Sequence, residues 1–318
     1  MSKPFKTIDE QIDLLRSRSL NFTDEDKAKR YLLCNNYYNV INYYSKFFMD
    51  SPDHYKRGTT FDEISHLYYF DKEIKGIFFK ALLEIEKMFK SLIAYYFSED
   101  HQENYAYLIV SNFKNDDIIN VVKMIANLSN IIGRAQKSST PNSIIHYINV
   151  HQNVPLWVLI NEISFGQTII FYKHMKDSEK NKIAKKLSEL LAENLGIDAI
   201  RLTPKHIISY LNNICEMRNI VAHGNKFLDY HCRKNTIYLS ELHSIYGISR
   251  NAPRQDIYNV FIVMRVFMSK NQFAVTNNSL RRRIIQLSKK ITTIDYNCIL
   301  MSLGFPSDWQ NYPKLPQD

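Results

Sequence analysis

The stretch "PKHIISYLNNICEMRNIVAH" (Pro204–His223) has the sequence features of one helix of about twenty residues. Thr203 is a good N-cap, Pro204 suits the first helical position, and Gly224 suits the position that ends the helix. At about 100° per residue, the apolar residues of the segment share one face. They are Ile207, Ile208, Leu211, Ile214, Cys215, Val221 and Ala222. Arg218 falls within roughly 20° of the centre of that face, so a permanent positive charge is predicted where the helix buries its apolar side chains.

The position of Arg218 has two interpretations. Arginine is rarely buried without a partner, because an unpaired buried charge is strongly destabilising. In the first interpretation, Arg218 pairs with a buried carboxylate such as Glu162 or Glu216, or extends its head group to water. In the second, the face opens onto a groove, and Arg218 binds an anionic substrate together with Asn219 and His223. The last two residues are neighbours at i and i+4. The spacing alone leaves both interpretations open.

The composition of the 318 residues favours long helices. Only 8 glycines and 9 prolines are present, which leaves few tight turns, and 45% of the residues are apolar, enough for a sizeable core. No window approaches about 18 consecutive apolar residues, and the N-terminus is too polar for a signal peptide. We therefore expect a cytoplasmic protein with no membrane partner.

The cysteines and the net charge bear on cofactors and partners. The four cysteines are scattered and form no CxxC pair, and the histidine and cysteine spacings match no zinc template. We therefore expect no disulfide, no metal and no other cofactor. The net charge of +9 is compatible with a polyanionic partner, of which nucleic acid is the simplest.

Capping boxes mark the starts of two further helices. Thr7 with Glu10 forms the first, and Thr60 with Glu63 forms the second. Apolar residues continue at helical spacing after Thr60, which predicts a long helix that reaches Phe97.

The remaining segments divide into helices, a loop and one strand candidate. "PLWVLINEISFGQ" (Pro155–Gln167) is predicted to be a single helix, and Asp177–Gly196 another. Gly133–Ser143 has the composition of a loop. "NTIYLS" (Asn235–Ser240) is the single convincing strand candidate, and it is short. A chain of this pattern is predicted to be all-α.

A resemblance to a known family rests on four blocks of sequence. "RNIVAHG" (Arg218–Gly224) matches the Arg-x4–6-His signature of the HEPN superfamily of all-helical ribonucleases and RNA-binding domains, in which asparagine often follows the arginine. The blocks "KPFKTIDEQIDLLRSRSLNF", "NNYY" and "PLWVLINEISFGQTIIFYKHM" precede it in that order. Over roughly Lys3–Tyr230, the chain resembles the bacterial abortive-infection family of AbiD and AbiF type.

The resemblance implies a fold, a domain organisation and a function. It implies a HEPN-like helical core, which we place at residues 58–240, and we expect an N-terminal helical extension at 1–57 and a C-terminal one at 241–318. It further implies a phage-defence protein that cuts or binds RNA and is controlled by a small noncoding RNA.

Arg218, Asn219 and His223 are the residues that the resemblance assigns to catalysis. RNA carries its own nucleophile, the 2′-hydroxyl, so no metal is required, and histidine exchanges protons near neutral pH. The expected products are a 2′,3′-cyclic phosphate and a 5′-hydroxyl. Because transfer needs both an acid and a base, we expect a homodimer that joins two motifs in one composite site.

Basic residues near the motif and in one later helix are candidate RNA contacts. Lys226 and Arg233 follow the motif directly, and Arg282 and Lys289 occupy the polar face of "RRRIIQLSKK". The inward face of that helix consists of Leu280, Ile284, Leu287 and Ile291. Two other functions stay open: a non-catalytic RNA-binding protein of the same fold, and an interaction module for a separate partner enzyme. The chain has no Walker A loop and no nucleotidyltransferase signature of its own.

Overall fold

Helices dominate residues 4–317, the part of the chain that the computed structural model describes. The α-helices are α1 (Ile8–Ser17), α2 (Glu25–Asn35), α3 (Phe61–Asp100), α4 (Ile118–Gln136), α5 (Ser143–His151), α6 (Leu156–Leu159), α7 (Phe165–His174), α8 (Asp177–Leu195), α9 (Pro204–Ala222), α10 (Ser240–His243), α11 (Ile257–Met264), α12 (Lys270–Ser288) and α13 (Asn297–Ser302). A π-helix, η1 (Tyr38–Asn42), and several single 3₁₀ turns complete the helical part. The strands β1 (Met49–Ser51) and β2 (His54–Tyr55) form one antiparallel hairpin. The prediction of an all-α fold is confirmed.

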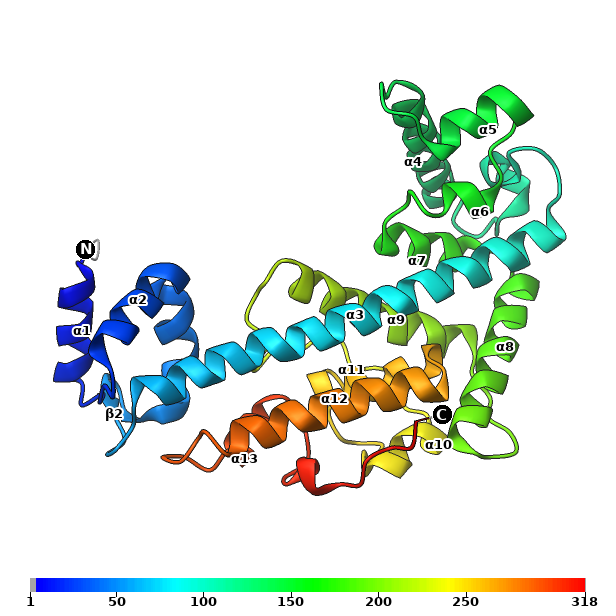
Figure 1. Cartoon of the computed structure of the whole chain (residues 1–318). Coiled ribbons are helices and arrows are strands. Elements are labelled where there is room, and N and C mark those ends of the chain that lie inside the picture. The colour runs from blue at the N-terminus through cyan, green and yellow to red at the C-terminus, as the bar shows by residue number, and fades with distance from the viewer. Residues whose placement is uncertain (1–3, 318) are drawn as a thin grey trace.

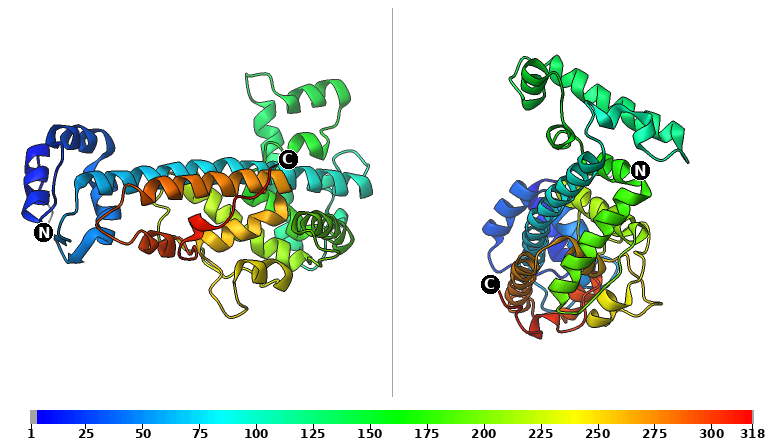
Figure 2. Two further views of the ribbon diagram at one scale, coloured as in Figure 1. Left: turned by 60° about the horizontal axis from the view of Figure 1, so that its bottom comes forward. Right: turned by 90° about the vertical axis from the view of Figure 1, so that its right-hand side faces the viewer.

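Helix α3 is the axis around which the other helices are arranged. Its 40 residues extend for about 60 Å. In Figure 1, α1 and α2 lie beside its first turns, α12 runs along its length, and α4 and α5 project from its far end. The turned views in Figure 2 show the same order, with α12 on one side of α3 and α9 and α11 on another. The capping boxes predicted at Thr7 and Thr60 are both present, and α3 continues three residues beyond the predicted Phe97.

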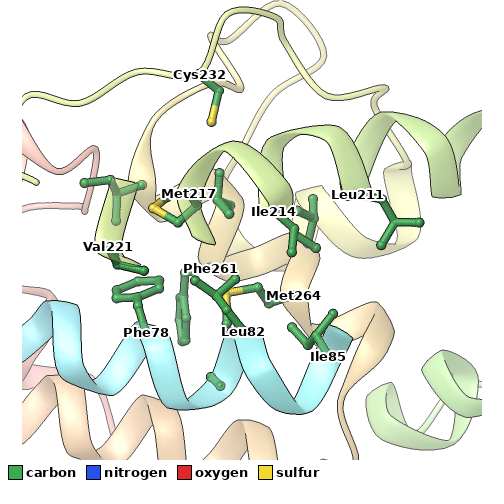
Figure 3. Close-up of a cluster of buried hydrophobic side chains, with 14 of the residues drawn as sticks. Phe78, Leu82, Ile85, Leu211, Ile214, Met217, Val221, Cys232, Phe261 and Met264 are labelled. Atoms are coloured by element: carbon green, nitrogen blue, oxygen red, sulfur yellow. The ribbon is translucent and has the colours of Figure 1, made fainter. Parts of the chain in front are cut away.

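The core that positions α9 lies between α3, α9 and α11. Figure 3 shows side chains of the three helices meeting in one cluster. They are Phe78, Leu82 and Ile85 of α3, Leu211, Ile214, Met217 and Val221 of α9, and Phe261 and Met264 of α11. Truncating one such side chain to alanine typically costs about 2–5 kcal/mol. This apolar cluster therefore fixes the rotation of α9 about its axis and, with it, the directions of the polar side chains of α9.

Two helix boundaries differ from the sequence prediction. The segment Pro155–Gln167 is not one helix but the single turn of α6 followed by the start of α7. The cause is a capping box: the backbone N–H of Gln167 donates to Ser164 Oγ at 3.3 Å, and the backbone N–H of Ser164 donates to Gln167 Oε1 at 2.9 Å. The predicted loop at residues 133–143 is also shorter, because α4 continues to Gln136.

The strand predicted at Asn235–Ser240 is wrong. Residues 235–239 have no regular secondary structure, Ser240 begins α10, and no neighbouring strand pairs with the segment among residues 4–317. Instead, the backbone N–H of Thr236 donates to the carbonyl of Arg254 at 3.0 Å, and that of Ile237 donates to Ser209 Oγ at 2.9 Å. These single hydrogen bonds hold the segment beside α9 and the segment before α11 without forming a ladder.

A buried carboxylate at the start of α3 holds the segment that follows α12. Glu63 Oε1 accepts hydrogen bonds from the backbone N–H groups of Thr292 and Thr293, at 2.7 and 2.9 Å. Burial raises the pKa of Glu63, but the hydrogen bonds from Thr292, Thr293 and Thr60 outweigh it, so its pKa lies below the ordinary value. A carboxyl with a lowered pKa stabilises the fold above its unfolded-state pKa, and this contribution is lost as the pH falls through the folded-state pKa.

We predict that Glu63→Gln lowers the free energy of unfolding by about 1–3 kcal/mol at neutral pH, because an amide N–H₂ group then faces N–H donors. Chemical denaturation at neutral and acidic pH measures this. The difference from wild type should shrink as the pH falls below 4.5, the ordinary pKa of the group. Glu84→Gln, at an exposed position of the same helix, should change stability by less than about 0.5 kcal/mol. Equal stabilities of the Glu63→Gln and Glu84→Gln proteins would contradict the role given to Glu63.

Candidate active site on helix α9

The helix predicted around the Arg-x4-His motif is confirmed. The hydroxyl of Thr203 caps its start, and Pro204 is its first residue. At its end, His223 is the C-cap, and its backbone N–H donates to the carbonyl of Asn219 at 3.1 Å. Gly224 then adopts a φ of +67°, the left-handed conformation that favours glycine. His223 is consequently held by backbone geometry at the exposed end of the helix.

The buried face of α9 differs from the predicted one, and this changes the position of Arg218. The buried residues are Ile207, Tyr210, Leu211, Asn213, Ile214, Met217 and Val221. Tyr210 and Met217 thus join the buried face, whereas Ile208 and Cys215 are half-buried and Ala222 is exposed. The prediction that Arg218 lies near the centre of the buried face is therefore wrong. Its side chain, 29% exposed, lies on the border beside α3.

Arg218 contacts a carboxylate of α3 that the sequence interpretation did not name. Arg218 Nε lies 3.3 Å from Glu86 Oε2, and the Glu86 side chain is only 10% exposed. The other carboxylate oxygen lies 2.9 Å from Lys90 Nζ. Two cations thus share one anion, and one positive charge stays uncompensated at the border of α9.

The two carboxylates considered from sequence lie elsewhere. Glu162 is exposed. Glu216 Oε2 instead accepts hydrogen bonds from the hydroxyl of Tyr230 at 3.3 Å and the backbone N–H of Arg233 at 3.0 Å. Glu216 therefore binds the segment that follows α9, and the carboxylate that pairs with Arg218 is that of Glu86.

Asn219 and His223 are both exposed and face two different pockets. Arg218 Nη1 donates to Asn219 Oδ1 at 3.4 Å, the one hydrogen bond of the Arg218 side chain within residues 4–317. Asn219 and Arg233 line a pocket of about 620 Å³ between α7, α9 and the segment after α9. His223 and Lys226 line a second pocket, of about 490 Å³, between α3, η1 and the end of α9. Arg218 lines neither.

The structure thus joins some of the predicted site residues and separates others. Arg218 and Asn219 are in contact, Asn219 shares a pocket with Arg233, and His223 shares one with Lys226. Arg218 and His223 do not share a pocket within one chain. Arg282 on α12 and Lys289, the residue that follows this helix, are exposed as predicted and line neither of the two pockets. A site that contains all of the predicted residues must therefore include protein surface outside these two pockets.

Sequence reasoning missed a buried ion pair that holds the loop after the motif. Asp71 Oδ1, fully buried on α3, accepts the backbone N–H groups of Phe227 at 3.2 Å and Leu228 at 3.1 Å. Lys75 lies one turn later, with its Nζ 2.9 Å from Asp71 Oδ2. The same Nζ donates to the carbonyls of Gly224 and Asn225, at 3.3 and 3.1 Å.

The signal for these contacts was present in the sequence. Asp71 occupies a position on the apolar stripe of α3, between Leu67 and Ile74, and Glu86 is likewise next to the buried Ile85. An acidic residue on a buried stripe requires a partner, because an unpaired buried carboxylate is costly. The stripe indicates that a partner exists, but it does not identify the partner.

The described residues, 4–317, contain no cluster of three or more histidine, cysteine, aspartate or glutamate side chains arranged to hold a metal ion. All four cysteines are free. Among the same residues, no helix combines the length and the apolar character that crossing a membrane requires.

Comparison with known proteins identifies the family. No curated protein and no solved structure matches the chain. The sequence model of a family described as "Abi-like protein" matches residues 30–229, more than half of the chain. The matched range contains Glu86, Arg218 and His223, and it supports a role in abortive infection, a form of phage defence. The resemblance to the abortive-infection family is confirmed at this level, whereas the HEPN assignment of the motif stays a prediction. The chain belongs to the Abi-like protein family.

Proposed function

We propose that this Abi-like protein is a metal-independent endoribonuclease of phage defence, acting in the cytoplasm, with Arg218, Asn219 and His223 as its catalytic residues. The observation that carries the proposal is the way Arg218 is held. Glu86 Oε2 lies 3.3 Å from Arg218 Nε as an ion pair without a hydrogen bond, and because Glu86 also pairs with Lys90, the positive charge of Arg218 is not cancelled. A guanidinium that is only partly compensated, at a partly open border, is suited to stabilising charge on phosphorus.

The reaction is an in-line transfer within the RNA backbone. The 2′-oxygen attacks the adjacent phosphorus, and the bond between phosphorus and the 5′-oxygen breaks. A base removes the proton of the 2′-hydroxyl, and an acid gives a proton to the departing 5′-oxygen. The exposed imidazole of His223 serves as one of these groups, and Asn219 orients the phosphate or the imidazole. The products are a 2′,3′-cyclic phosphate and a 5′-hydroxyl.

A homodimer supplies the second acid–base group. Within one chain, His223 and Arg218 face different surroundings, so a single motif does not enclose a phosphodiester. A two-fold arrangement of two α9 helices would place His223 of one chain near Arg218 of the other and complete two equivalent sets. A small noncoding RNA that occupied the pockets beside Asn219 and His223 would keep the enzyme inactive.

A non-catalytic RNA-binding protein is the second candidate. The observation that favours it is the same separation of Asn219 and His223 into two pockets. Basic residues line both pockets, which suits holding a strand without cutting it.

We predict that His223→Ala lowers the rate of RNA cleavage by about 10²–10⁴-fold while the protein stays dimeric. Cleavage of labelled RNA in the presence of EDTA, with end-group analysis and size-exclusion chromatography, measures this. His231→Ala, which removes an exposed histidine outside the motif, is the matched control and should cleave at the wild-type rate.

Two results would contradict the ribonuclease proposal: a dimeric His223→Ala protein that cleaves at the wild-type rate, and strong inhibition of wild type by EDTA. If wild type binds RNA without cutting it, and Arg218→Ala weakens that binding, the non-catalytic candidate holds.

We predict that Glu86 acts on catalysis only through Arg218. Glu86→Gln should slow cleavage by about 10- to 100-fold, because the guanidinium loses its anchor. In an Arg218→Ala background, the same change should have almost no further effect, since the group that it positions is gone. Cleavage rates of the two single variants and the double variant measure the coupling. Additive losses would show a general structural role instead. Glu84→Gln should have no effect in either background.

We predict that Arg282→Glu weakens RNA binding and flattens its dependence on salt. Each lost phosphate contact to a single strand should reduce the slope of log K against log salt by about 0.7. Fluorescence anisotropy over a series of salt concentrations measures the slope. Arg30→Glu on α2, also exposed, is the control with the same change of net charge. Identical slopes for the two variants would remove Arg282 from the RNA-binding surface.

A further inference from the structure

The pocket beside His223 has a composition that the motif alone does not explain. It is formed by η1, by the middle of α3 and by the loop after α9, and its volume is about 490 Å³. Sites for small ligands typically measure roughly 300–1,000 Å³. The pocket is therefore large enough for one nucleotide and lies directly against the proposed acid–base group.

The pocket is positively charged. Lys72, Lys75 and Lys226 line it, and within the described chain none of its lining residues is acidic. Two nearby carboxylates compensate only part of this charge. Asp71 pairs with Lys75, and Asp229 is shared between Lys226, at 2.8 Å, and Lys46, at 2.6 Å. Four ammonium groups thus face two carboxylates, and the excess charge suits a phosphate.

Aromatic rings form much of the remaining wall. Tyr43, Tyr44, Tyr68 and Phe79 line the pocket, and Phe79 is 37% exposed although it is large and apolar. The ammonium of Lys72 lies 5.5 Å from the centre of the Tyr68 ring. Alternating rings and ammonium groups are the pattern by which proteins hold an unstacked base and its phosphate.

Unusual backbone builds the side of the pocket that carries Asn39 and Tyr43. Both belong to or border η1, a π-helix, a conformation that is rare and frequent at functional sites. Just before it, Asn36 has a φ of +61°, which is strained for a residue other than glycine. Asn36 Oδ1 accepts the backbone N–H of Tyr38 at 2.9 Å and so supports this conformation.

The opposite wall is fixed as well. Lys75 holds the carbonyls of Gly224 and Asn225, and Asp71 holds the next N–H groups of that loop. On α3 itself, Gly76 lines the pocket, and a Cβ added there would meet no atom within 4 Å. The position is therefore open to side chains that extend into the pocket, which makes it useful for a test.

We infer that this pocket binds an unpaired nucleotide next to the scissile phosphate, and that the protein consequently acts on single-stranded RNA. The rings of Tyr43 and Phe79 stack on the base, and Lys72 and Lys226 hold its phosphate beside His223, whereas Lys75 is occupied by Asp71 and the loop carbonyls. A base paired inside a duplex cannot enter the pocket, because RNA helices keep their bases stacked and present only edges. The inference rests on the proposed function in one respect, that His223 acts on RNA.

Binding of fluorescently labelled RNA to the full-length protein tests the inference, with the same strand offered alone and annealed to its complement. Tyr43→Ala and Gly76→Glu remove a ring and place a negative charge in the pocket, respectively. Tyr43→Ala should weaken single-strand binding by about tenfold or more, the loss that one base–aromatic stack typically causes. Gly76→Glu should weaken it by a similar factor, because the added carboxylate repels the phosphate. Their controls, Tyr69→Ala and Gly133→Glu, should bind as wild type, because neither residue lines the pocket and a Cβ added at Gly133 of α4 would meet no atom within 4 Å.

Each outcome decides one point. Unchanged single-strand binding by Tyr43→Ala and Gly76→Glu would overturn the pocket assignment, even if wild type cleaves RNA. Equal affinity of wild type for duplex and single strand would overturn the single-strand preference. Displacement of the labelled strand by free AMP at low concentration would assign the pocket to a mononucleotide instead of RNA. If the pocket variants lose binding but no protein cuts RNA, the pocket assignment stands and the ribonuclease proposal fails.

Discussion

The packing of α9 against α3 determines where every polar residue of the candidate site lies. The two helices run antiparallel, so that Ile85 faces the middle of α9 and Phe78 faces its end (Figure 3). At the edge of this apolar seam, α3 holds α9 at two points, through Glu86 at Arg218 and through Asp71 at the loop after Gly224. Because α3 is one continuous helix, these anchors are fixed about 22 Å apart along its axis. The end of α9 is therefore placed by the core and not by its own exposed residues.

The same arrangement of charges occurs at Glu86 and at Asp229, which lies in the segment after the motif. Glu86 lies between Arg218 and Lys90, and Asp229 lies between Lys226 and Lys46. In each case the carboxylate orients two cations without cancelling them. Burial raises the pKa of Asp229, but the two lysines outweigh it and keep that pKa below its ordinary value, so the carboxylate remains charged near neutral pH. A surface of this kind attracts anions while its side chains keep defined positions, a combination that exposed lysines alone would not give.

Features that depend on neighbours in sequence were predictable, and features that depend on distant neighbours were not. Thr203, Pro204 and Gly224 define α9 by local capping, and the start of α3 follows from Thr60 and Glu63 in the same way. The Ser164 capping box is equally local, but apolar residues continue across it, and they favour the prediction of one unbroken helix. In contrast, the partner of Arg218 could not be deduced, since Glu86 comes from a helix far away in the chain. The π-helix at Tyr38–Asn42 has no sequence signature of its own, so the pocket beside His223 emerges only from the structure.

The geometry at the end of α9 gives a direction for a bound strand. Asn219 and His223 are one helical turn apart, with Cβ atoms about 5–6 Å from each other, and this is comparable to one step along an extended RNA backbone. A strand that crossed the end of α9 would pass from the pocket lined by His223 and Lys226 to the pocket lined by Asn219 and Arg233. A duplex could place phosphates on the same lysines, but its paired bases would leave the rings of Tyr43 and Phe79 uncovered. Electrostatic attraction to RNA does not require exposed aromatic rings. Recognition of an unpaired base does require them, so these rings favour an unpaired base as the ligand.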